Sequence, residues 1–184
     1  MKKTMTNTAE ICARLKCLFG VKETPEAFDE VKTAISLRYI DVKCVAAQVL
    51  GDWGSPQAKD LLKKALMESY YRKQNYQLRG VIVKALSSCL SEADSSWLLE
   101  HYFDVNGVLN KHELLPAVLA LPPDSARQRL VLESKSENRD NRQAAMKAIA
   151  HIGFKDRNQL LSRFVQDQDK GIRKAASYLI NKST

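Results

Sequence analysis

One nine-residue pattern of apolar and polar positions returns five times along the chain. Its copies are VKCVAAQVL at 42–50, LRGVIVKAL at 78–86, KHELLPAVL at 111–119, NRQAAMKAI at 141–149 and IRKAASYLI at 172–180. The fourth, fifth, eighth and ninth positions are apolar in every copy. On a helix, positions one, four, five, eight and nine fall within an arc of about 140°. The pattern therefore predicts five amphipathic helices, spaced 36, 33, 30 and 31 residues apart.

Proline and glycine residues, which end and begin helices, predict a second helix before each patterned one. Thr24-Pro25 and Ser55-Pro56 each place an N-capping side chain before a proline suited to the first helical position. An additional helix, capped at Asn7, precedes these pairs in residues 1–20. We therefore predict an all-α chain of about eleven helices: one N-terminal capping helix and five helical pairs, over about 21–54, 55–91, 92–121, 122–153 and 154–184.

A period of 30–36 residues with two helices per unit is typical of stacked helical solenoids. Such a stack has one continuous core, so we expect residues 1–184 to form a single repeat domain. The third helical pair, over about 92–121, should be the irregular member of the stack, because Pro116 lies inside the patterned helix and cannot donate a backbone N–H. The loop over 104–110 is also longer than the other predicted connections.

Two segments carry a family resemblance: DVKCVAAQVLGDWGSPQAKDLLKKAL at 41–66 and DNRQAAMKAIAHIGFKDRNQLLSRFV at 140–165. In each, an acidic residue precedes a basic one, and paired alanines, an apolar pair, a glycine and a new helix follow. This resembles the HEAT repeat, specifically the short HEAT-like repeat named after phycobilin lyases, over about residues 21–184. The resemblance implies a right-handed α-α superhelix whose second helices line a concave surface. It also implies several functional classes, because members include binding scaffolds, lyases and DNA glycosylases.

The second position of the pattern is always basic or histidine. We call these five residues the basic ladder and interpret them as mostly structural, with side chains that bond to polar groups of the turns within the stack. The family resemblance implies that each basic residue pairs with an aspartate of the preceding turn. In three of the helical pairs an aspartate stands at that place: Asp41, Asp140 and Asp169. The ladder consists of Lys43, Arg79, His112, Arg142 and Arg173.

No motif in the sequence indicates catalysis. The four cysteines form no CxxC pair and have no histidine at zinc spacing, so we expect no metal and no cofactor. Asp124 and Asp140 could act as catalytic acids of a glycosylase-like groove, but both stand at predicted helix starts, where N-capping explains them better. We therefore expect a protein without catalytic residues.

The sequence offers no membrane or export signal. The basic start MKKT is not followed by the apolar run of a signal peptide, and no stretch approaches the roughly 20 apolar residues of a membrane span. We expect a cytoplasmic protein with reduced thiols. The net charge is +8 and uneven, reaching +6 over residues 139–184 after −4 over residues 92–138.

Positions three and seven of the patterned helices point away from the apolar arc. They form either a plain solvated face or a binding face, and the candidate partner-binding residues there are Lys84, Gln143, Lys147, Lys174 and Tyr178. The leading hypothesis is a non-enzymatic scaffold that binds a protein partner with an acidic surface on a concave, partly basic face. The alternative is a nucleic-acid-binding HEAT-like protein, with DNA-glycosylase-type activity as one form of it. A lyase-type chromophore chaperone is the third class.

Overall fold

The computed structural model describes residues 8–71, 76–107 and 109–182. Regular structure in this part of the chain is entirely helical, with eleven α-helices, two short 3-10 helices and no strand. The predicted all-α fold class is confirmed. None of the described helices is long and apolar enough to cross a membrane. The predicted N-cap at Asn7 lies outside the described residues.

The chain divides into two compact units, Met1–Leu90 and Ser91–Thr184. The first contains α1 (Thr8–Lys16), α2 (Pro25–Ser36), α3 (Ile40–Trp53), α4 (Pro56–Tyr71) and α5 (Tyr76–Cys89). The second contains η1 (Glu92–Asp94), α6 (Ser95–Phe103), α7 (Lys111–Leu119), α8 (Pro123–Glu133), α9 (Arg139–His151), α10 (Arg157–Ser162), η2 (Arg163–Gln166) and α11 (Lys170–Asn181). The first helix of the pair predicted over 154–184 is thus an α-helix, α10, that tightens into the 3-10 turn η2.

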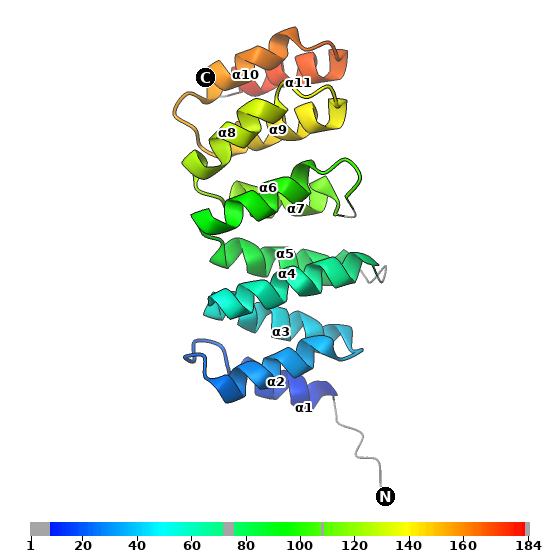
Figure 1. Ribbon diagram of the computed structural model, residues 1–184, viewed down its shortest axis with the longest axis vertical. Helices are drawn as coiled ribbons and strands as arrows, with labels where there is room; N and C mark the ends of the chain where they lie inside the picture. The colour runs from blue at the N-terminus through cyan, green and yellow to red at the C-terminus, as the bar shows by residue number, and fades with distance from the viewer. Residues whose placement is uncertain (1–7, 72–75, 108, 183–184) are drawn as a thin grey trace, which may run out of the picture. The chain divides into compact units, whose positions relative to one another are not determined.

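Within each unit the helices form two layers (Figure 1). In the first unit α3 packs against α2 and α5, α2 packs against α4, and the capping helix α1 packs against α3. In the second unit α7 packs against α6 and α9, and α9 also contacts α8, α10 and α11. The patterned helices of each unit therefore lie together in one layer, and the helices that precede them lie in the other.

The apolar positions of the pattern form the cores of the two units. The fifth position is at most 1% exposed in four copies, at Ala46, Ile82, Ala145 and Ala176. Small residues bring the patterned helices of the first unit close together. A Cβ added at Gly51 on α3 would lie only 2.8 Å from the Cβ of Ala85 on α5, and 2.9 Å from its backbone.

The third patterned helix departs from the prediction for its outward positions. Ala117 stands at position seven, which should face away from the core, yet it is 1% exposed. Its buried residues are Leu114, Ala117, Val118 and, just past the helix, Leu121. These follow the i, i+3, i+4, i+7 spacing, so the buried stripe of α7 is rotated relative to the other patterned helices. The helix runs through Pro116, which is exposed.

Helix starts confirm two of the predicted caps and correct two others. The hydroxyls of Thr24 and Ser55 each accept a backbone N–H three residues on, at 3.2 and 3.1 Å. Asp140 was expected to cap α9, but Asn138 does so, accepting N–H groups at 2.8 and 3.1 Å. Asp124 likewise lies inside the first turn of α8. Both carboxylates stand where the helix dipole favours negative charge, and neither is the cap.

Candidate interaction site on the second unit

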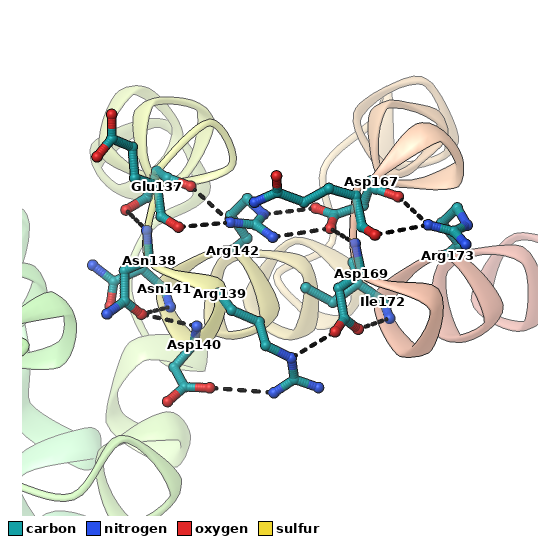
Figure 2. A network of polar contacts seen from close by, with 12 residues as sticks. Glu137, Asn138, Arg139, Asp140, Asn141, Arg142, Asp167, Asp169, Ile172 and Arg173 are labelled. Atoms are coloured by element: carbon teal, nitrogen blue, oxygen red, sulfur yellow. Dashed lines mark hydrogen bonds and ion pairs between the residues drawn. The ribbon is translucent and has the colours of Figure 1, made fainter.

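The most buried ion pair among the described residues of the second unit is formed by Arg142 of α9 (Figure 2). The Arg142 side chain is 6% exposed, and its Nε and Nη2 donate to the two carboxylate oxygens of Asp167 at 2.8 and 3.1 Å. Its Nη1 donates to the carbonyl oxygens of Ser136 and Glu137, both at 3.0 Å. Because Asp167 belongs to the turn before α11, one guanidinium ties the turn before its own helix to the next turn along the chain.

Arg173 repeats half of this arrangement 31 residues later. Its Nη1 donates to the carbonyl oxygens of Asp167 and Gln168, at 2.6 and 3.0 Å, which stand six and five residues before it as Ser136 and Glu137 stand before Arg142. The predicted pairing with the preceding aspartate is wrong for both arginines. Arg142 takes Asp167 rather than Asp140, and Arg173 bonds to backbone carbonyls.

The aspartates of the two turns are instead bound by Arg139, one turn before Arg142. Its Nε donates to Oδ2 of Asp169 at 2.8 Å, and its Nη1 lies 3.3 Å from Oδ1 of Asp140 (Figure 2). Asp169 also caps α11, because its Oδ1 accepts the backbone N–H of Ile172 at 2.9 Å. The guanidinium of Arg139, followed by this backbone donor, lowers the pKa of Asp169 to about 2.

The other acidic groups of this region are held in the same way. The bond from Arg142 lowers the pKa of Asp167. On the other layer, Arg127 of α8 donates through Nη1 to Oδ1 of Asp156 at 2.7 Å and through Nη2 to Oδ2, which lowers the pKa of Asp156. Each of the three aspartates therefore stays ionised to lower pH than a free side chain would.

This pairing leaves a set of cations without counter-charges. Residues 139–184 contain ten basic and four acidic side chains. All four acids are paired with arginines: Asp140, Asp156, Asp167 and Asp169. Within the described residues, the basic side chains that form neither an ion pair nor a hydrogen bond are mostly lysines: Lys147, Lys155, Arg163, Lys170, Lys174 and Lys182. Arginines thus hold the unit together, and lysines supply its excess positive charge.

Four of the five candidate partner-binding residues lie on α9 and α11, which contact each other. Gln143 and Lys147 are half-buried and line a groove of about 450 Å³ between α7 and α9, whose other walls include His112 of the ladder. Lys174 and Tyr178 are exposed on α11, where the Tyr178 side chain is 62% exposed. The ammonium of Lys182 lies 6.0 Å from the centre of the Tyr178 ring.

The fifth candidate, Lys84, belongs to the first unit. It is exposed on α5 and lines a smaller groove of about 190 Å³ with Gln48, the equivalent position of α3. Two other ladder residues also lie in this unit. Lys43 is half-buried on α3, and the guanidinium of Arg79 stacks 4.5 Å from the ring centre of Tyr70 on α4.

Sequence reasoning missed Asn141, the first position of the fourth copy. Its side-chain Nδ2 donates to the carbonyl of Phe103 at 3.1 Å and to Glu133 at 3.0 Å, so one buried amide links α9 to the end of α6 and to α8. Its polar identity at a position inside the apolar arc was the available signal. Among the described residues, no group of three or more His, Cys, Asp or Glu side chains could hold a metal ion.

Comparisons with known proteins add little to this description. No family model and no curated protein matches the chain. A similar solved structure is the crystal structure of an engineered protein, with 14% sequence identity, coverage of 98% of this chain and 93% of that chain, and a TM-score of 0.45. A likeness at that TM-score supports no inference about the function of this chain.

Proposed function

We propose that this protein is a non-enzymatic HEAT-like scaffold that binds an acidic protein partner through α9 and α11 of its second unit. The observation that carries the proposal is the division of charge described above. Every aspartate of residues 139–184 is bound by an arginine, and within the described residues Lys147, which is half-buried, and Lys174, which is exposed, form no ion pair. Uncompensated cations on one face attract and orient an acidic partner.

The regular spacing of the arginine contacts supports the HEAT-like assignment. Arg142 and Arg173 stand 31 residues apart and close their turns through carbonyl groups at the same sequence offsets. The side-by-side packing of α7, α9 and α11 also agrees with stacked repeats. In the proposed right-handed superhelix these patterned helices form the concave side.

The type of cation favours a protein partner over a nucleic acid. Arginine is the residue best suited to bidentate recognition of phosphate groups. In residues 139–184 all arginines except Arg163 donate hydrogen bonds inside the chain, to carboxylates or to backbone carbonyls. Lysines remain for the partner, together with a single exposed tyrosine on the described part of α11. Such a surface suits dispersed carboxylates, with Tyr178 as an aromatic contact at its centre.

The proposal is tested by site-specific cross-linking followed by a binding measurement. A photoreactive amino acid at Tyr178 in the native host would identify the molecule that contacts α11. We expect a protein with an acidic segment. Its affinity for the purified chain should fall as salt is raised, because exposed charges are screened over about 10 Å at 0.1 M salt. The double variant Lys147→Glu, Lys174→Glu should weaken binding while leaving the melting temperature nearly unchanged.

A matched control reverses the same number of charges elsewhere on the unit. Lys135 and Lys155 are exposed lysines that, like Lys147 and Lys174, form no ion pair, but they lie in the turns after α8 and before α10. The Lys135→Glu, Lys155→Glu variant should bind the partner nearly as well as the natural chain. Equal loss in both double variants would mean that net charge alone drives binding. Wild-type affinity of the Lys147, Lys174 variant at low salt would refute the site. A gel shift of DNA or RNA at physiological salt would favour the nucleic-acid alternative.

A further inference from the structure

A second site lies in the first unit, in a pocket of about 600 Å³ at the C-terminal end of α3. Its walls come from the loop between α1 and α2 and from the last turn of α3. They include Val21, Lys22, Glu23, Asp52 and Trp53. We propose that this pocket binds a cationic side chain of a partner, a guanidinium or an ammonium group, between its carboxylates and the indole.

The carboxylate of Glu23 is the main reason to expect a cation. Its Oε2 is buried and has no hydrogen-bond partner, and it is one of two such side-chain atoms in the described residues. Its Oε1 forms no hydrogen bond or ion pair either, and it is not buried. The neighbouring Lys22 is exposed and forms no ion pair. A carboxylate that is partly desolvated and lacks an internal partner is stabilised by an incoming cation that bonds to its accessible oxygen.

The other walls are fixed in place by contacts between the loop and the helix. The indole Nε1 of Trp53 donates to the carbonyl of Val21 at 3.0 Å. The backbone N–H of Gly20 donates to Oδ2 of Asp52 at 2.8 Å, and Gly20 has a positive φ of 68° that favours glycine. Trp53 is half-buried, and it lines the pocket. Aromatic faces attract guanidinium and ammonium groups, and a site prepared in this way loses little entropy on binding.

Two further features match a cationic side chain. The 14-residue helix α3 points its C-terminal end at the pocket, and its last turn carries no basic residue, so the negative end of its dipole has no cationic partner within that turn. Val21 is 48% exposed and Phe19, two residues earlier, is 39% exposed. Val21, which lines the pocket, offers contact to the aliphatic stem of an arginine or lysine, and Phe19 lies outside the lining.

The test uses the full chain and three small probes. These are blocked arginine, blocked lysine and blocked citrulline, the last being a neutral molecule of nearly the same shape as arginine. The indole N–H signal of Trp53, assigned with Trp53→Phe, reports binding by NMR. The indole signal of Trp97 on α6 serves as the internal reference. We expect a saturable shift with at least one of the two cations and none with citrulline.

Two variants decide whether Glu23 holds the ligand. Glu23→Gln should weaken cation binding about tenfold, because a charge-assisted hydrogen bond becomes a neutral one. Its melting temperature should not fall, since Glu23 makes no internal hydrogen bond that glutamine would lose. Glu26→Gln, an equal charge change at an exposed position of α2 outside the pocket, should bind normally. If Glu23→Gln is unstable, Asp52→Asn removes charge from the same pocket and should also weaken binding.

Three results would overturn the proposal. The first is unchanged binding by both Glu23→Gln and Asp52→Asn. The second is a shift of Trp53 by citrulline equal to that by arginine, which would indicate apolar binding without charge recognition. The third is the absence of a saturable shift with either cation. These outcomes are independent of the acidic partner proposed for the second unit. The substitutions tested here, at Glu23 and Asp52, lie in the first unit, and Lys147 and Lys174 lie in the second.

Discussion

Replacing Asp167 by asparagine should destabilise the second unit far more than a surface charge change would. The substitution keeps the shape of the side chain and an oxygen that can accept the backbone N–H of Asp169, now bonded to Oδ1 at 2.8 Å. It removes the charge opposite Arg142 and one of two side-chain acceptors for its guanidinium, leaving that cation buried with two backbone carbonyls and one neutral amide oxygen as partners.

The expected magnitude follows from the burial of both partners. Arg142 and Asp167 have side chains that are 6% and 5% exposed, so solvent screens this pair very little. Removing one partner of a buried ion pair costs about 3–5 kcal/mol, against about 0–1 kcal/mol for an exposed pair. Because two carbonyls continue to accept from Arg142, we expect a loss near the lower end, about 3 kcal/mol.

The two tryptophans allow the loss to be assigned to a unit. Trp53 lies on α3 and Trp97 on α6, so fluorescence of a Trp53→Phe chain follows the second unit during urea unfolding. The Asp167→Asn midpoint should fall in that experiment, while Trp53 fluorescence in a Trp97→Phe chain should change little. The control is Asp140→Asn, whose side chain is 71% exposed and paired only at 3.3 Å. A loss below 1 kcal/mol for Asp167→Asn would refute the assignment of this pair as buried and structural.

Two further predictions concern packing and pH. Gly51→Ala should destabilise the first unit by about 1–3 kcal/mol, because the new methyl would meet the backbone of Ala85 at 2.9 Å. Gly80→Ala, where the new methyl enters open space on a helix, should instead stabilise the unit by about 0.5–1 kcal/mol. Urea unfolding followed by Trp53 fluorescence measures both changes. The pKa of Asp169 is depressed to about 2 against about 3.9 in an unfolded chain, so its contribution to stability is complete above about pH 5 and is lost as pH falls toward 2. Asp169→Asn should therefore flatten the fall of the second unit's urea midpoint between pH 5 and pH 2, and an unchanged slope would contradict the pairing with Arg139.

The helices and their burial were readable because they depend on local chemistry. The apolar arc requires only the helical repeat of 3.6 residues, and caps such as Thr24 and Ser55 act within one turn. The errors arose where competing residues lie close together in sequence. Asn138 and Asp140 both have side chains that can cap α9, and they lie only two residues apart. The sequence does not show which of the two has the extended backbone conformation that a cap needs, and in the structure it is Asn138. Ala117 was misplaced because the neighbours of α7 determine which of its faces is buried.

The sequence by itself determined the helical class, the positions of the helices, the apolar face of four of the five patterned helices, and the excess of positive charge at residues 139–184. The tertiary structure decided which of those charges are available. Arg142 and Asp167 are 25 residues apart in the chain, and Arg139 and Asp169 are 30 apart. Such pairs form only when successive turns are brought within hydrogen-bond distance, and no local preference encodes that distance. For the same reason, arginines and lysines that look equivalent in the sequence divide into internal contacts and a free cationic surface.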